Sequence, residues 1–135
     1  MQRVVVLDTN ALIFDALKPT RLSHTARSLI EQAHAQSDLA CCDISLWEIV
    51  MLVAKGRIDP RVPALEFIKL ALAARSFSVL AITPEIADLS VSFGDAVGSD
   101  PADRLIAATA VHYRATLITT DKELQRAGLP IKVIR

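Results

Sequence analysis

The sequence lacks the signals that would place it in several large classes of protein. Its 135 residues carry no formal net charge, because 15 lysines and arginines match 15 aspartates and glutamates. No strong overall field therefore draws the chain to a polyanion. No uncharged apolar stretch is long enough to span a bilayer, and the chain reaches Asp8 too soon after Met1 for a signal peptide. These features favour a cytoplasmic protein with no membrane partner.

Cysteine and histidine are scarce, and their positions do not suggest chemistry. The only two cysteines, Cys41 and Cys42, are adjacent in an apolar run. Neighbours in a strand point to opposite faces, so a disulfide between them would distort the backbone. We expect both to be small buried residues. The three histidines, His24, His34 and His112, are scattered and show no zinc spacing.

The motifs of several common enzymes are also absent. There is no Gly-x-Gly-x-x-Gly, no phosphate-loop Gly-Lys-Ser/Thr and no nucleophile-elbow serine. The sequence contains no internal repeat, linker or low-complexity segment. A chain of this length with 52% hydrophobic residues suits one domain, spanning residues 1–135, with a real core.

What the chain does contain is a regular alternation of apolar strands and amphipathic helices. Val4–Leu7 ends at Asp8 and is typical of a central strand buried on both faces. Strands are predicted at 3–8, 39–43, 77–82, 116–119 and 131–134. Helices are predicted at 11–17, 24–36, 46–55, 60–75, 101–114 and 122–126, with a short helix from Thr83 and a loop at 93–99. This alternation predicts an α/β fold in three layers, with a central parallel sheet of about five strands flanked by helices.

Acidic residues stand where strands end and helices begin. Asp8 and Asp121 each follow a strand, and Asp103 lies at the third position of the helix that Asp100 caps. In an open parallel sheet these positions meet at one edge, where ligands bind. Glu48 is the only charge between Ile44 and Ala54, in a helix that is apolar nearly all round and is expected to be buried.

Each acid also has a purely structural interpretation. Asp8, Asp100 and Asp121 suit helix N-caps, and Ser45 to Glu48 fits a capping box. Asp103 is redundant for capping. Arg104 has two interpretations: contact with a substrate phosphate, or a surface ion pair with Asp100 or another acid. These alternatives stay open from the residues alone.

The joint arrangement favours a metal site. An oxygen-only cluster of Asp8, Glu48, Asp103 and Asp121 suits Mg²⁺, or Mn²⁺. Setting these four aside leaves 11 acids against 15 bases, so the rest of the surface is basic by about four charges.

Four segments closely resemble the PIN-domain ribonucleases, and within them the VapC type, the toxin half of type II toxin–antitoxin pairs. They appear in the family's order and span the chain, and the third is the most specific. They are Val6–Leu12, Ser45–Ile49, Asp100–Ala110 and Leu117–Asp121. The sequence departs from many relatives at Ala102, where a bulkier residue is common, and in lacking a histidine shortly before Asp100.

The resemblance implies a metal-dependent endoribonuclease that hydrolyses RNA, such as tRNA or rRNA, with a water activated by Mg²⁺ or Mn²⁺. It also implies a cognate antitoxin and a homodimer. Asp8 and Asp103 are the expected main ligands, with Glu48 a ligand or a residue that orients the water, and Asp121 completing the site. Secondary candidates for supporting or phosphate contacts are Thr9, Asn10, Asp100, Arg104 and Thr119. The rival interpretations are an antitoxin-independent PIN nuclease in RNA processing, a non-catalytic module whose acids are caps, and a metal-dependent phosphatase.

Overall fold

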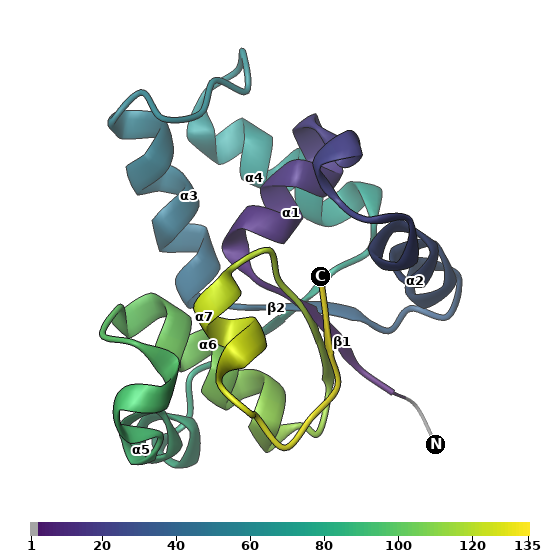
Figure 1. Ribbon diagram of the computed structural model, residues 1–135. Helices are drawn as coiled ribbons and strands as arrows, with labels where there is room; N and C mark the ends of the chain where they lie inside the picture. Colours follow the sequence, from purple (N-terminus) through teal and green to yellow (C-terminus); the bar gives the residue numbers. More distant parts are fainter. Residues whose placement is uncertain (1–2) are drawn as a thin grey trace.

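The fold consists of five short strands with helices between them (Figure 1). The computed structural model describes residues 3–135. The elements in chain order are β1 (Val5–Leu7), α1 (Thr9–Leu17), η1 (Pro19–Arg21), α2 (His24–Ala35), β2 (Leu39–Cys42), α3 (Ile44–Ala54), α4 (Ala64–Ala74), β3 (Ser78–Leu80), α5 (Pro84–Ser92), η2 (Gly94–Val97), α6 (Pro101–His112), β4 (Thr116–Ile118), α7 (Lys122–Arg126) and β5 (Val133–Ile134).

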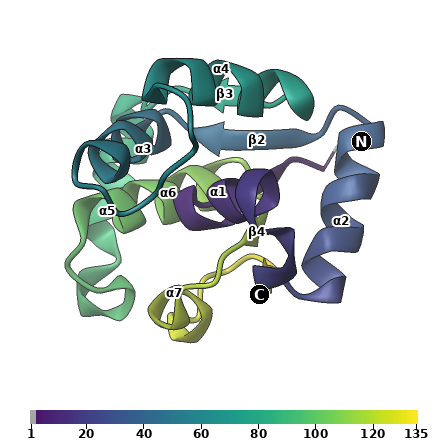
Figure 2. The ribbon, with the colours of Figure 1, turned by 90° about the horizontal axis from the view of Figure 1, so that it is seen from above.

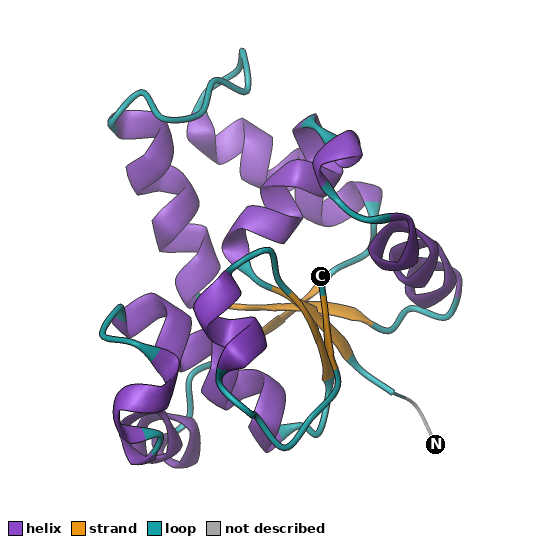
Figure 3. Ribbon diagram, in the orientation of Figure 1, coloured by secondary structure: helices purple, strands orange, loops and turns teal. Residues whose placement is uncertain are grey.

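All five strands pair in parallel, in the order β3-β2-β1-β4-β5, and form the centre of the molecule (Figure 3). The predicted parallel α/β sheet is therefore confirmed. Strand β1 lies in the middle, with Val6 beside Ala40 of β2 and beside Leu117 of β4. The chain builds the sheet outward from β1 in one direction and then returns to add β4 on the other side. The boundary between β1 and β4 is thus the topological switch point of the sheet.

Alternate residues of the central strands supply two separate cores. Val5 and Leu7 of β1 pack on one face of the sheet, and Val6 packs on the other. Cys41 and Cys42 follow the same rule, since each is free, fully buried and on a different face. The prediction of two small buried cysteines is confirmed.

Helices cover both faces of the sheet, which gives the three predicted layers (Figure 2). Helices α1, α2, α3 and α4 contribute to the core that contains Leu7. Helices α6 and α7, with η2, contribute to the core that contains Val6, and α5 packs along α6. No helix within residues 3–135 combines the length and the apolar character needed to cross a membrane.

Several helices differ from the prediction at their boundaries, and one also differs in its burial. Helix α1 begins at Thr9 instead of residue 11, and α6 ends at His112 instead of residue 114. Helix α4 begins at Ala64 instead of Pro60, because Arg61 has a positive φ of 63° and Pro63 occupies the N-cap position. Helix α3 was expected to be buried, and this is wrong: only Ser45 and Ile49 are buried, while Trp47 is 58% exposed. Part of the expected loop at 93–99 forms the short η2 helix.

The capping box predicted for α3 is also wrong. The helix begins at Ile44, so Ser45 lies inside it, and Asp43 occupies the N-cap position without a side-chain capping bond. Ser45 is completely buried beneath α1 instead. By contrast, Ser23 caps α2 and Thr83 caps α5, since their hydroxyls accept hydrogen bonds from Ala26 N and Ile86 N.

Candidate active site

Two neighbouring strands deliver polar side chains to the switch point of the sheet. Asp8 follows β1, and Thr119 and Asp121 follow β4. The backbone joins these positions, because Asp8 N donates to Ile118 O at 3.1 Å. The sequence therefore predicts correctly that the ends of two separate strands bring Asp8 and Asp121 to one edge.

Asp8 is held in one orientation by two hydrogen bonds. Its Oδ1 accepts from Ala11 N at 2.7 Å, which caps α1, and its Oδ2 accepts from the Thr119 hydroxyl. The residue is only 4% exposed. Burial raises the pKa of Asp8 from its ordinary 3.8 to about 6, against the lowering effect of the two hydrogen bonds. Asp121 and Glu48 add smaller repulsive contributions to that pKa.

A second hydrogen-bond chain positions Glu48. The Thr9 hydroxyl donates to Glu48 Oε1 and lies 2.9 Å from Ser45 Oγ. A hydroxyl carries one proton, so with Glu48 ionised the Ser45 hydroxyl supplies the proton for its own contact with Thr9. Desolvation raises the pKa of Glu48, the bond from Thr9 lowers it, and Asp100 raises it by repulsion. Thr9 thus contacts an acid of the cluster, and its role in the site stays a prediction.

The pKa of Asp103 is raised further than that of Asp8. Asp103 lies half-buried in the first turn of α6, after the N-cap Asp100. Desolvation raises the pKa of Asp103 from 3.8 to about 7, helped by repulsion from Asp100, Asp121, Glu48 and Asp8, in that order. Every other acid of the predicted cluster therefore acts on Asp103, although each comes from a different element.

The aspartates that cap helices use one oxygen to do so. Oδ1 of Asp8 caps α1, Oδ1 of Asp100 accepts from Ala102 N and Asp103 N, and Oδ1 of Asp121 accepts from Glu123 N and Leu124 N. The predicted caps are confirmed. Because a carboxylate has two oxygens with several acceptor positions, capping leaves acceptor capacity for a ligand.

The cluster fits a hard divalent cation in its donor chemistry, since all its donors are carboxylate oxygens. Within residues 3–135, no lysine or arginine forms an ion pair with any of the four acids. As the side chains lie, however, no three acidic, histidine or cysteine side chains of this described part are close enough to hold an ion. Oxygens of Asp8 and Glu48 accept hydrogen bonds from the Thr119 and Thr9 hydroxyls, so acidic side chains would have to move before three of them could hold one ion.

Comparison with known proteins shows the family of this chain. Residues 5–129 match the family described as the PIN domain. The chain belongs to the PIN-domain family. A curated relative, Ribonuclease VapC22 of Mycobacterium tuberculosis, is 34% identical to this PIN domain over 121 residues, which cover 90% of this chain and 89% of the relative. The predicted family membership is confirmed.

Solved structures share the fold of this PIN domain. VapBC2 from Rickettsia felis, bound to a DNA fragment from the promoter, superposes with a TM-score of 0.73 at 18% identity and covers 96% of each chain. A toxin–antitoxin complex from Klebsiella pneumoniae has a TM-score of 0.62 at 26% identity, with 97% of this chain and 96% of the other covered.

Two secondary candidates do not join the acids through any contact in the described residues. Asn10 is exposed in the first turn of α1. Arg104 donates from both terminal nitrogens to backbone carbonyls, to Ser90 O at 3.0 Å and to Gly94 O. The interpretation of Arg104 as an ion-pair partner of Asp100 is therefore wrong. Contact of Asn10 or Arg104 with phosphate stays a prediction.

Sequence reasoning missed one supporting residue of the site. Ser45 was interpreted as a helix cap, but it is buried and touches Thr9 across 36 positions of sequence. The available signal was its small polar side chain in a run of apolar residues directly after a strand. A buried hydroxyl needs a partner, and that partner had to come from another element.

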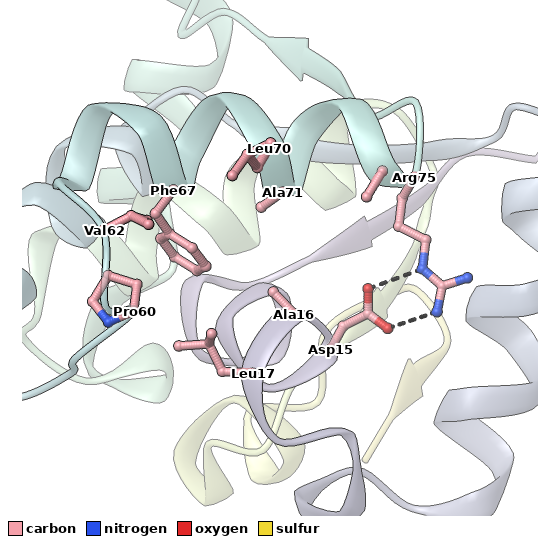
Figure 4. A pocket seen from close by; sticks show the side chains of 10 residues that line it. Asp15, Ala16, Leu17, Pro60, Val62, Phe67, Leu70, Ala71 and Arg75 are labelled. Atoms are coloured by element: carbon pink, nitrogen blue, oxygen red, sulfur yellow. Dashed lines mark hydrogen bonds and ion pairs between the residues drawn. The ribbon is translucent and has the colours of Figure 1, made fainter.

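Two grooves lie on the α3–α4 side of this PIN domain. One, of 260 Å³, borders Glu48 and Asp100 and runs along α3. The other, of 350 Å³, lies between α1 and α4, with Leu17, Phe67 and Leu70 in its apolar lining (Figure 4). Asp15 and Arg75 close one end of this second groove through a two-pronged ion pair, with N–O distances of 3.0 and 3.1 Å.

Proposed function

We propose that this PIN domain is an Mg²⁺- or Mn²⁺-dependent endoribonuclease and the toxin of a type II toxin–antitoxin pair. The observation that carries the proposal is that Asp8, Glu48 and Asp121 all lie near enough to Asp103 to repel its charge, while no lysine or arginine within residues 3–135 pairs with any of the four. A relative named as a ribonuclease and structural neighbours solved as VapBC complexes support it.

The acids have distinct roles in this proposal. Asp8 and Asp103 would be the main ligands of the cation. Burial and repulsion from neighbouring acids raise their pKa values to about 6 and 7, so a nearby cation would stabilise their charged forms most. Glu48 would be a ligand or hold the attacking water, and Asp121 would complete the site. A bound Mg²⁺ or Mn²⁺ supplies Lewis-acid activation of water and stabilises charge on the phosphoryl oxygens.

The surrounding residues fix the geometry of the acids. Thr119 and the α1 backbone hold both oxygens of Asp8, and Thr9 holds one oxygen of Glu48. These donors come from a strand end and from the first turn of a helix, so the backbone fixes where they lie. Thr119 is completely buried, so water does not compete for its hydroxyl.

Cleavage of a mixture of tRNA and rRNA tests the proposal. The purified chain should produce discrete fragments with Mg²⁺ and none with EDTA, and Asp103→Asn should reduce the rate at least about 100-fold. Products should end in 5′-phosphate and 3′-hydroxyl. A 2′,3′-cyclic phosphate formed in EDTA would contradict the metal-dependent hydrolysis proposed here. Cleavage of a chromogenic phosphate ester but not of RNA would favour a phosphatase.

The cognate antitoxin is the second part of the proposal. We place an apolar segment of that protein in the groove between α1 and α4, where Leu70 is 57% exposed although it lines the groove (Figure 4). Leu70→Asp should abolish inhibition by the antitoxin while RNA cleavage persists. Leu65→Asp is the matched control, because Leu65 is a 64% exposed leucine of α4 outside the lining of this groove. Sedimentation of the chain alone tests the predicted homodimer.

The alternative of a non-catalytic module has one specific observation in its favour. Asp8, Asp100 and Asp121 each cap a helix, so a structural role explains their positions. Capping does not explain Asp103, which caps nothing and whose pKa is raised to about 7. If Asp103→Asn left cleavage unchanged in a folded protein, the module interpretation would replace the nuclease.

A further inference from the structure

The groove along α3 opens beside the acidic cluster. Its lining contains Glu48 of the cluster and Asp100, the N-cap residue of the helix that carries Asp103. The remaining lining residues come from α3 and from the segment that follows it: Trp47, Met51, Leu52, Lys55 and Arg57. The groove therefore leads from the acids, along a helix, to two cationic side chains.

The order of residues along α3 gives this groove an acidic end and a cationic end. Trp47, Met51 and Lys55 are spaced four residues apart, so they form one stripe along the helix, about 12 Å long at 1.5 Å per residue. Trp47 lies next to Glu48 at the acidic end of the stripe. Lys55 lies at the other end, and Arg57 follows it. An aromatic platform thus stands beside the acids, and the cations lie farther away.

Trp47 is unusually exposed for its size. Its exposed fraction is 58%, and it is the only tryptophan in the chain. A large aromatic ring left in water can gain free energy by stacking on another flat apolar surface. In proteins that bind single-stranded nucleic acid, such rings stack on bases while cationic groups follow the backbone.

We propose that this groove binds the nucleotides next to the scissile phosphate of a single-stranded RNA segment. Trp47 stacks on a base, and Lys55 and Arg57 contact phosphates farther along the strand. The inference rests on the proposed nuclease function, because the acids define where the scissile phosphate lies. It adds three residues, Trp47, Lys55 and Arg57, that position the substrate beside the acids.

Charge supports RNA as the occupant of this groove. The acids repel phosphate wherever no cation neutralises them, so a strand needs positive side chains once it leaves the cluster. Lys55 and Arg57 supply two such charges at that distance. The groove between α1 and α4 is lined by leucine, valine, phenylalanine, alanine and proline and by one ion pair, so it suits an apolar protein segment better.

The single tryptophan makes the stacking contact directly measurable. A short 2′-O-methyl ribo-oligonucleotide of mixed sequence is titrated into the full chain with Ca²⁺ in place of Mg²⁺, and gel analysis verifies that it stays intact. Stacking should quench the Trp47 fluorescence in proportion to the bound fraction. Trp47→Ala should raise Kd, measured by anisotropy of a labelled oligonucleotide, about 5- to 150-fold, and Trp47→Phe should restore part of the affinity.

Matched controls separate stacking and phosphate contact from general effects. Tyr113→Ala removes another aromatic ring, which is 40% exposed at the far end of α6, and should leave Kd unchanged. Lys55→Ala and Arg57→Ala should each reduce the slope of log Kd against log salt by about 0.7. Lys69→Ala, on an exposed position of α4 outside the groove, should not change that slope.

These experiments distinguish failure of the groove inference from failure of the nuclease proposal. Quenching together with the Trp47→Ala loss supports the groove. If Trp47→Ala and Tyr113→Ala bind and cleave RNA equally well, the groove inference is wrong while the nuclease stands. If Trp47→Ala changes only the oligomeric state or antitoxin binding, the face belongs to a protein partner and the inference is wrong. If the unaltered chain neither binds nor cleaves RNA, both proposals fail.

Discussion

The Thr119 hydroxyl donates a hydrogen bond to Oδ2 of Asp8 across 111 positions of sequence. The same Thr119 oxygen accepts from Asp121 N at 3.0 Å. One buried hydroxyl therefore links the acid at the end of β1 to the acid that follows β4. This contact explains why Asp8 keeps one orientation at an edge where neighbouring acids repel it.

Replacing Thr119 by valine should weaken this link. Thr119→Val leaves Oδ2 of Asp8 without its donor and Asp121 N without its acceptor, so the free energy of unfolding should fall by about 1–3 kcal/mol. The pKa of Asp8 should rise further above 6, because the bond from Thr119 lowers it. Urea unfolding measures the first effect, and carboxyl NMR titration measures the second. Thr119→Ser keeps the hydroxyl and should behave like the unaltered chain; equal losses in both variants would contradict this account.

Neutralising Asp8 should stabilise the protein when no divalent ion is present. Asp8→Asn keeps an oxygen to cap α1 and removes a buried charge that Glu48 and Asp121 repel. We expect Tm in EDTA at neutral pH to rise by roughly 5 °C, and the Mg²⁺-induced increase in Tm to disappear. Asp15→Asn is the control. Asp15 is also nearly buried but pairs with Arg75, so its replacement should lower Tm instead.

Without metal, the contribution of Asp8 and Asp103 to the free energy of unfolding should fall as pH rises. Most carboxyl groups in folded proteins have the opposite effect, because folding lowers their pKa. The folded-state pKa of Asp8 is about 6 and that of Asp103 about 7, both above the ordinary 3.8. A raised carboxyl pKa favours folding below pH 4 and loses that contribution as pH rises through 6 to 7. For Asp8 alone the loss is at most about 3 kcal/mol. Urea unfolding in EDTA, measured from pH 4 to pH 7, gives the free energy of unfolding at each pH. A value that does not change with pH in the unaltered chain would contradict this prediction.

Arg104 should act through the backbone that it binds. Its guanidinium holds the carbonyls of Ser90 and Gly94, at the end of α5 and the start of η2. Arg104→Met should therefore lower the free energy of unfolding by about 1–2 kcal/mol and leave the Kd for RNA unchanged. Arg104→Lys should recover only part, because lysine lacks the forked donors. Weaker RNA binding with unchanged stability would show instead that Arg104 contacts phosphate.

The sequence predicts the sheet and the position of the acids well, because both depend on local pattern. The β-branched run before Asp8 and the pair of threonines before Asp121 mark strands that end in acids, and parallel pairing brings those ends together. The capping roles of Asp8, Asp100 and Asp121 also follow from residues close to them in the chain. The resemblance to PIN domains implies the same four acids, Asp8, Glu48, Asp103 and Asp121, that their joint arrangement already indicates.

What the sequence does not predict depends on neighbours that are distant along the chain. Ser45 fits a cap by local pattern, but Thr9 of another helix gives it a partner inside α3. The apolar composition of α3 suggests burial, yet Trp47 stays exposed because no described element covers that side of the helix. The carbonyls that bind Arg104 lie 10 and 14 positions earlier, at the start of η2 and near the end of α5, and no sequence motif predicts that these two positions face Arg104.

Binding of Mn²⁺ tests the central claim that these acids hold a divalent cation. Isothermal titration of the unaltered chain at neutral pH should give one or two saturable sites. Asp103→Asn should abolish or greatly weaken them, whereas Asp95→Asn, an exposed acid in η2, should retain them. If the folded chain binds no Mn²⁺, or if Asp103→Asn binds it as well as the unaltered chain does, the acids are structural caps and the claim is wrong.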